Sequence, residues 1–132
     1  MTEALTDEEL TFLRSLFDLA RVGDTERLEE AVEAGIPVNL TNEVGDSLLM
    51  LAAYHDHPDT VRVLLARGAD TARINDRGQT ALGAAVFRRS ERSVTHLLAA
   101  GADPALGPRS ALDIARFFDL PQMVKLLDQH GG

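Results

Sequence analysis

Six residues recur as three neighbouring pairs at a nearly constant spacing, and their types suit recognition of another protein. Each pair begins with an aromatic residue, and these aromatic residues are separated by 33 and then 30 positions. The pairs are Tyr54-His55, Phe87-Arg88 and Phe117-Phe118. Aromatic and Arg side chains are enriched in binding hot spots, so the spacing predicts a ladder of rings edged by cationic or titratable groups. The alternative is that the rings pack as core.

A second cluster has the spacing of metal ligands. His55, Asp56 and His57 are followed by Asp59, and a His-x-His turn can bind zinc. Structural zinc sites need four convergent ligands, however, and the chain contains no Cys. We therefore predict that the protein binds no metal and no cofactor.

Catalytic signatures are also missing from the sequence. There is no nucleophile elbow, no Gly-rich phosphate loop and no His-rich metal motif, so we expect a protein that is not an enzyme. Arg88, Arg89 and Arg92 form a small basic cluster. Three charges are too few to indicate nucleic acid binding, and an acidic protein segment is the better match for them.

Composition indicates a single folded domain. The 132 residues are 45% hydrophobic and 26% charged, without a single Cys. No apolar run is long enough for a membrane span, and the acidic start lacks a basic region followed by an apolar one. These features predict a cytoplasmic protein. Twelve Arg against one Lys is typical of a GC-rich genome and favours a bacterial source.

The net charge of −8 is unevenly distributed. Residues 1–33 carry a net charge of −7 and residues 34–132 a net charge of −1. This balance argues against a nucleic acid partner, because phosphate neutralisation needs a basic surface. The acidic end could steer a basic partner or serve as a solvated cap, and we favour the cap.

The elements that would position these residues repeat every 33 positions. The segment from Gly45 to Asp70 recurs from Gly78 to Asp103, with matching Ser or Thr, Leu, Val and Gly-Ala-Asp residues. A fixed period of this length is the mark of a solenoid. In each unit Ser47 or Thr80 can cap a first helix, and a Gly closes a second helix in the left-handed conformation. Each helix pair has an apolar face that it buries only by stacking on its neighbours.

These residues resemble the ankyrin repeat family, whose pattern includes T-P-L-H, an apolar helix and G-A-D. The resemblance covers about 115 residues, from near Phe17 to Gly131, and implies antiparallel helix pairs joined by hairpin-like fingers in a curved array. It also implies that the fingers and the concave surface contact partners, and that His57 is the structural histidine of a turn.

The chain departs from the family pattern at two places. Where the family has T-P-L-H, this chain has S-L-L-M, T-A-L-G and S-A-L-D, so its hydrogen bonds between neighbouring loops should differ. Gly83 inside a helix should cost about 1 kcal/mol relative to Ala. The family's turn Gly is replaced by Asp56, Arg89 and Asp119, and these residues must therefore adopt a positive φ.

The order of elements predicts four repeats, at approximately residues 7–39, 40–72, 73–105 and 106–132. Thr6 and Glu9 form a capping box at the first helix. The second helix has an acidic outer face that suits an N-terminal cap, made of Glu26, Glu29, Glu30 and Glu33. The third connection, from Gly101 to Ser110, is three residues shorter than its predecessor, and we expect an irregular turn there instead of a finger.

We therefore predict an all-α, ankyrin-type solenoid with two internal and two capping repeats, spanning residues 1–132 as one domain. Its function would be non-catalytic binding of an unknown protein partner through the concave groove and the finger tips. Tyr54, Phe87, Phe117 and Phe118 would anchor the partner, whereas His55, Arg88, Asp76 and Arg77 would supply orientation and charge selectivity. The remaining finger-tip candidates are Glu43, Val44, Asp46 and Gln79. The alternatives are an inhibitor or regulator of a partner enzyme and a self-assembling structural protein; we expect a monomer when no partner is bound.

Overall fold

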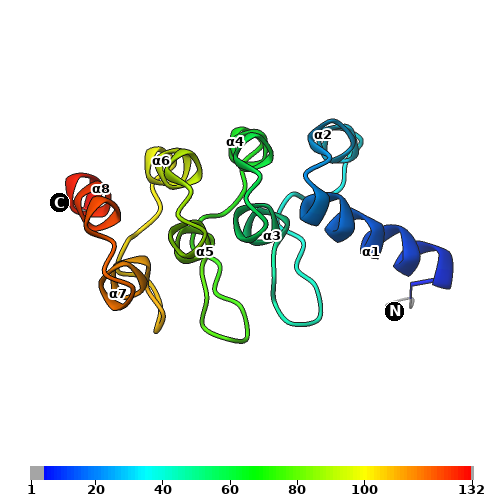
Figure 1. The fold of residues 1–132 in the computed structure, drawn as a ribbon. Coiled ribbons are helices and arrows are strands. Elements are labelled where there is room, and N and C mark those ends of the chain that lie inside the picture. Colours follow the sequence, from blue (N-terminus) through cyan, green and yellow to red (C-terminus); the bar gives the residue numbers. More distant parts are fainter. Residues whose placement is uncertain (1–4, 132) are drawn as a thin grey trace.

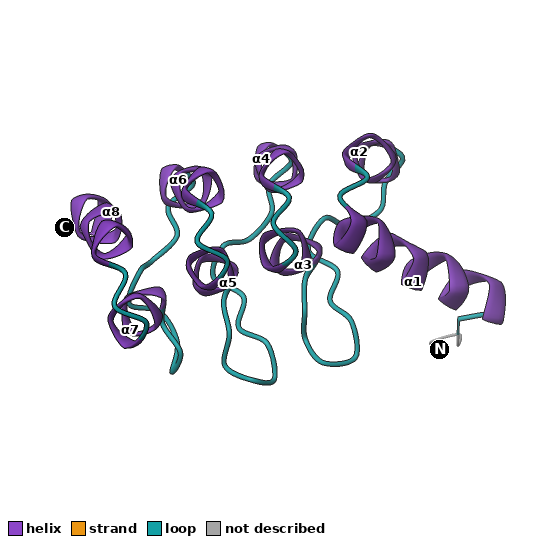
Figure 2. Ribbon diagram, in the orientation of Figure 1, coloured by secondary structure: helices purple, strands orange, loops and turns teal. Residues whose placement is uncertain are grey.

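The computed structural model describes residues 5–131, with side chains through Gln129. Eight helices form within this range and alternate between two rows, which run side by side along a stack (Figure 1). Loops make all of the connections between them (Figure 2). The helices are α1 (Asp7–Val22), α2 (Thr25–Glu33), α3 (Leu48–Tyr54), α4 (Pro58–Ala66), α5 (Ala81–Phe87), α6 (Glu91–Ala99), α7 (Ala111–Phe117) and α8 (Pro121–Gly131). The predicted helical solenoid is confirmed.

Each row is held together by contacts between equivalent helices. The odd-numbered helices α1, α3, α5 and α7 stack on one another, and α2, α4, α6 and α8 stack in the second row. The core lies between the rows, and its largest members are leucines at equivalent positions, such as Leu49 with Leu82 and Leu64 with Leu97. Burying one such side chain stabilises the fold by about 1.5–3 kcal/mol. Ala52 and Ala85 are completely buried and let the helices approach closely.

Helices α3, α5 and α7 each begin at a residue whose hydroxyl caps the helix, as the sequence predicts for the first two. The side chains of Ser47, Thr80 and Ser110 accept hydrogen bonds from backbone amides three residues further on. Thr6 and Glu9 form a reciprocal capping box at α1. Such a cap contributes about 1 kcal/mol to stability, and here it also fixes where each of these helices starts relative to the loop before it.

The turns between paired helices adopt the expected left-handed conformation. Asp56, Arg89 and Asp119 have φ values of 62°, 57° and 52°. Gly23 takes the same role after α1, with φ of 76°, and a Cβ there would lie 2.5 Å from the His57 ring. The Nε2 of His57 hydrogen-bonds to the Arg21 carbonyl oxygen at 2.7 Å. The ring therefore ties the second repeat to the end of α1, in agreement with a structural role.

Two fingers extend from the row of odd-numbered helices, one before α3 and one before α5, and hydrogen bonds join them. The first finger comprises residues 36–46 and the second residues 69–79 (Figure 1). Asn75 is 7% exposed, and its amide donates to Asp46 Oδ1 at 2.7 Å and to Gln79 Oε1 at 2.9 Å. The backbone N–H of Asp76 donates to the Val44 carbonyl at 3.0 Å. These bonds join neighbouring loops without the Pro and His of the family pattern.

The third connection, residues 101–110, is the irregular turn that the sequence predicts. Pro104 is buried, and its carbonyl accepts from the Leu112 amide at 3.1 Å. Pro108 packs so closely on the second finger that a Cβ on Gly78 would lie 2.7 Å from Pro108 Cγ. Gly83 is explained in a similar way, because a Cβ there would lie 3.1 Å from Ile114 Cδ1. The space that Gly83 leaves is therefore used by the following repeat.

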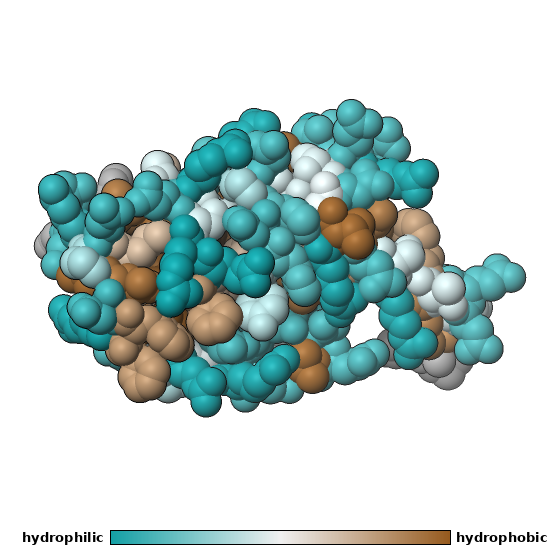
Figure 3. All heavy atoms as spheres, in the orientation of Figure 1, coloured by the Kyte–Doolittle hydropathy of each residue, from teal (hydrophilic) through white to brown (hydrophobic). Residues whose placement is uncertain are grey.

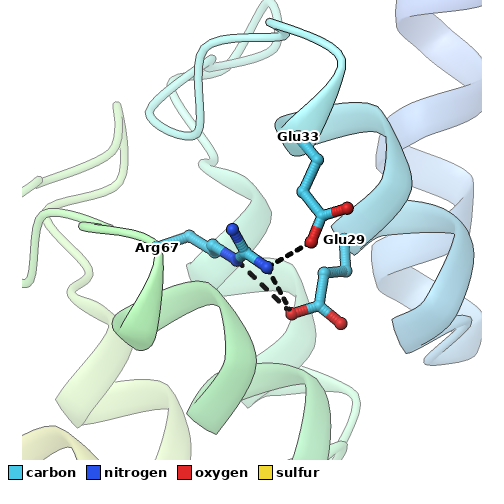
Figure 4. A network of polar contacts seen from close by, with 3 residues as sticks. All are labelled: Glu29, Glu33 and Arg67. Atoms are coloured by element: carbon cyan, nitrogen blue, oxygen red, sulfur yellow. Dashed lines mark hydrogen bonds and ion pairs between the residues drawn. The ribbon is translucent and has the colours of Figure 1, made fainter.

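Two glutamates of the acidic outer face of α2 also contact the next repeat. Glu29 and Glu33 are ion-paired with Arg67 at the end of α4, while their side chains stay 38% and 52% exposed (Figure 4). The Arg67 guanidinium lies 3.0 Å from Glu29 Oε2 and also contacts Glu33. Hydrogen bonding to Glu29 is the main cause that raises the pKa of Arg67 above its ordinary value. The two carboxylates thus lie on the side of α2 that faces the next repeat.

Candidate functional site

The predicted aromatic ladder exists and is exposed to solvent. Tyr54 at the end of α3 stacks on Phe87 at the end of α5, with ring centroids 6.1 Å apart and planes inclined by 3°. The Phe87 ring meets Phe118 edge to face at 5.8 Å, and Phe118 meets Phe117 at 5.0 Å. The exposed fractions are 44% for Tyr54, 40% for Phe87, 41% for Phe118 and 82% for Phe117. The rings therefore pack against one another at the surface and are not part of the buried core.

The third aromatic residue of the ladder is not the one that the spacing in the sequence predicts. The sequence places Phe117 in register with Phe87, yet the ring that contacts Phe87 belongs to Phe118. Phe118 is the C-cap residue of α7, and the Arg89 guanidinium lies over its ring, 5.7 Å from the centroid. This cation–π contact favours a ring position between α5 and α7. Phe117 is left projecting into solvent.

Two hollows lie along the ladder and join into one groove, which we call the ladder groove. The polar half has a volume of about 460 Å³ and the aromatic half about 580 Å³. Tyr54, Gln79 and Ala84 line both hollows, so the two are adjacent. Each volume falls in the range of sites that bind a small molecule or a few side chains of a protein.

The fingers build the polar half. Its wall carries Glu43, Val44 and Asp46 from the first finger, with Arg77 and Gln79 from the second. The side chains of Asn42 and Asn75 accept two backbone N–H bonds each inside their own finger, which holds both tips in a defined shape. The charged side chains are therefore displayed from braced loops.

His55 is the histidine that lines the polar half. Its ring meets Tyr54 edge to face, with centroids 5.2 Å apart. Burial is the main cause that lowers the pKa of His55, and the nearby positive charges of His57, Arg21 and Arg88 lower it further. The His55 imidazole is accordingly neutral near pH 7 and can both donate and accept a hydrogen bond.

The ends of α5 and α7 build the aromatic half. Phe87, Phe117, Phe118, Ile114 and Pro108 line it, together with the polar side chains of Gln79, Arg109 and Asp113. Apolar side chains gather over α5 and α7 on the face of the molecule shown in Figure 3. No third finger stands beside α7, because residues 101–110 form the short turn. Pro108 and Arg109 of that turn line the aromatic half in place of a finger.

Most of the predicted site residues lie together. Ten line the ladder groove: Glu43, Val44, Asp46, Tyr54, His55, Arg77, Gln79, Phe87, Phe117 and Phe118. Asp76 and Arg88 are exposed but line neither hollow. Sequence reasoning missed Asn42 and Asn75, although their separation of 33 residues is a signal of a repeated role. It also missed Arg109, Asp113 and Ile114, which come to the groove through the short third turn.

Two members of the His and Asp cluster at residues 55–59 have other partners: His57 bonds to the Arg21 carbonyl and Asp59 pairs with Arg92. Among the side chains described, those of residues 5–129, no group of three or more His, Asp or Glu could hold a metal ion. None of the helices in that range is long and apolar enough to cross a membrane.

Comparison with known proteins agrees with this architecture. Residues 16–107 match the family model of three ankyrin repeat copies, which is more than half of the chain, so the protein belongs to the ankyrin repeat family. Ankyrin repeats are generally protein–protein interaction modules.

Relatives include bacterial and vertebrate proteins. An ankyrin repeat protein of Pseudomonas aeruginosa is 57% identical over 56 residues, which are 42% of this chain and 33% of that protein. An ankyrin repeat-containing protein of Treponema pallidum is 34% identical over 128 residues, which are 94% of this chain and 42% of that protein. The ankyrin repeat, SAM and basic leucine zipper domain-containing protein 1 of Equus caballus is 33% identical over 109 residues, or 80% of this chain and 22% of that protein. The chain thus spans less than half the length of each.

Proposed function

We propose that this protein is a non-catalytic module that binds a partner protein in the ladder groove. The observation that carries the proposal is the row of solvent-exposed, mutually packed rings of Tyr54, Phe87, Phe118 and Phe117. Exposed apolar groups of this kind cost solubility, and on a folded domain a contiguous patch marks an interaction site. A rigid aromatic cluster loses little conformational entropy on binding, which makes its rings suitable anchors.

The polar half supports the proposal because its charged side chains could orient a bound partner. Charges of both signs stand on fingers that hydrogen bonds brace, with Glu43 and Asp46 on one finger and Arg77 on the other. Charges around an apolar centre favour the correct partner and orientation more than they add affinity. An interface that covered both halves would bury about 800 Å² on each protein.

A groove variant tests the proposal. Phe87→Glu with Phe117→Glu places two charges among the rings, and we expect it to abolish recovery of the partner from a cell lysate, measured by pull-down and mass spectrometry. The matched control is Phe12→Glu with Val22→Glu, since both residues are exposed on α1, line neither half of the groove and receive the same charges. The control should retain every protein that the wild type retains.

Unfolding measurements show whether a loss of partner recovery comes from lost binding or from lost folding. Thermal unfolding followed by circular dichroism should show one cooperative transition for both variants. If the groove variant unfolds, Phe117→Glu alone replaces it, because Phe117 is 82% exposed. Equal recovery of partners with the wild type and a folded groove variant would contradict the proposal and move the interface to another face.

Binding leads to two possible roles, and one measurement distinguishes them. A captured partner that is an enzyme and loses activity when the module is added would make this protein an inhibitor; unchanged activity would make it an adaptor. We further propose a bacterial, cytoplasmic protein that is monomeric before it binds. The bacterial relatives and the Arg-rich composition support the source, and cell fractionation with sedimentation of the pure protein checks the rest.

A further inference from the structure

Several arginines beside the aromatic half lack a carboxylate partner. Six arginines have a carboxylate within 4.0 Å: Arg14, Arg21, Arg27, Arg67, Arg73 and Arg92. Among the described residues, the other six arginines make no such ion pair. Arg62 and Arg77 lie outside the aromatic half, whereas Arg88, Arg89, Arg109 and Arg116 line it or lie next to its rings in the sequence.

These four arginines come from three elements, and only Arg109 lines the aromatic half itself. Arg88 and Arg89 follow Phe87 at the end of α5, Arg109 lines the hollow from the third turn, and Arg116 precedes Phe117 in α7. The position of Arg89 is fixed by its contact with the Phe118 ring at 5.7 Å. A guanidinium held against a ring still exposes N–H donors along its edge, and such donors bind carboxylates with two parallel hydrogen bonds.

We infer that the aromatic half binds a segment of a partner protein in which one aromatic or leucine-like side chain is flanked by carboxylates. The inference rests on the proposed function and names the chemistry of its ligand. The apolar anchor enters the hollow between Phe87, Phe117 and Ile114. Its acidic neighbours pair with Arg109, which has no carboxylate partner, and with the N–H groups of Arg89 that its bond to the Phe87 carbonyl leaves available.

Asp113 gives the groove a direction. It is an acidic residue that lines the aromatic half from the first turn of α7, whereas Arg89 follows the end of α5. A carboxylate of the partner close to Asp113 would be repelled, whereas one close to Arg89 would be attracted. The acidic flank of the bound segment therefore lies toward the end of α5, and Asp113→Asn should strengthen binding of an acidic peptide by about two- to threefold.

The test uses the full chain and a random 12-residue peptide display library. We expect the selected peptides to share one Phe, Tyr, Trp or Leu with at least two acidic residues within three positions of it. A synthetic peptide of the selected sequence should bind at least about tenfold more weakly to the Arg89→Glu, Arg109→Glu double variant. It should bind Arg62→Glu as it binds the wild type, because Arg62 is an exposed arginine of α4 that lines neither half of the groove.

Each result of this test either supports or overturns the inference about the bound segment. Selected peptides without acidic residues, peptides that bind the double variant equally well, or a library without any enriched peptide would overturn the inference. So would self-association of the wild type that the double variant loses in sedimentation, because the occupant would then be a second copy. The proposed function is judged separately: a partner captured through Phe87 and Phe117 in the lysate experiment would stand even if the acidic chemistry failed.

Discussion

The two halves of the ladder groove are built from the same repeat unit but end differently. In the polar half, two complete fingers stand side by side and share the hydrogen bonds of Asn75. In the aromatic half, the second finger meets a turn that is three residues shorter, and Pro108 of that turn packs on Gly78 of the finger. One half is therefore defined by braced loops, and the other by the exposed ends of helices.

This difference shows how a short deletion in a solenoid can create a surface. The helices of the fourth repeat still stack in register, so the core tolerates the loss of three loop residues. The rings at the end of α7 then lack a finger of their own, and together with the ring at the end of α5 they form an apolar site beside a polar one. Repeat proteins can change a loop without disturbing the stack, because each unit depends only on its neighbours.

The largest expected effect breaks the bracing of the polar half. Asn75→Ala removes a nearly buried side chain that donates to Asp46 and Gln79 and accepts from the amides of Arg77 and Gln79. Each bond contributes about 1 kcal/mol, and the amides would lose a partner, so we expect a loss of about 2–4 kcal/mol in the free energy of unfolding. Urea denaturation measures it.

The control for this change is the next residue along the finger. Asp76 is exposed, and its side chain makes no hydrogen bond to another described residue, so Asp76→Ala should change stability by less than about 0.5 kcal/mol. Equal effects of the two substitutions would mean that the fingers contribute little to the fold and that the polar half is not braced.

A smaller loss of stability is expected from a substitution at the contact between the second finger and the third turn. Gly78 has φ of 78° and touches Pro108, whereas Gly68 has φ of 89° and no atom within 4 Å of its missing Cβ. Ala at either position adopts a left-handed conformation at a cost of about 1 kcal/mol. Only Gly78→Ala adds a clash with the ring, so we expect about 2 kcal/mol for Gly78→Ala and about 1 kcal/mol for Gly68→Ala.

Thermal unfolding of the two glycine variants checks this comparison. Equal losses of stability would show that Pro108 moves away freely, and that the third turn does not hold the second finger in place.

The sequence predicted the elements of this fold closely because local rules determine them. The 33-residue period, the caps at Ser47 and Thr80, and the left-handed turn at Asp56 each depend on a few neighbouring residues. The short third turn was likewise visible as three missing residues between Gly101 and Ser110. Most ladder residues could be placed because equivalent positions of stacked repeats lie side by side.

The side-chain arrangement could not be derived in the same way. Whether Phe117 or Phe118 meets Phe87 depends on how the last turn of α7 ends and on the position of Arg89. The pairing of Glu29 with Arg67 depends on the angle between α2 and α4. These contacts result from the three-dimensional approach of separate helices, which the periodicity of one chain does not specify.

The smallest expected effect distinguishes the halves by titration. The cations of the aromatic half are arginines, which stay charged at every accessible pH, whereas the polar half contains His55. Burial lowers the pKa of His55 in the folded protein below its ordinary value of 6.5. As the pH falls below 6.5, the unfolded chain takes up a proton at this position before the folded protein does, and stability is lost until the pH passes below the folded pKa.

NMR titration of the His55 ring checks this expectation, together with urea denaturation at pH 7.5 and at pH values between 6.5 and 5. The decrease in stability should be slightly smaller for His55→Gln, which keeps a polar side chain but cannot titrate. A His55 pKa above 6.5, or an identical pH dependence in the variant, would mean that neither desolvation nor the neighbouring positive charges disfavour the charged ring. The two halves would then not differ in their response to pH.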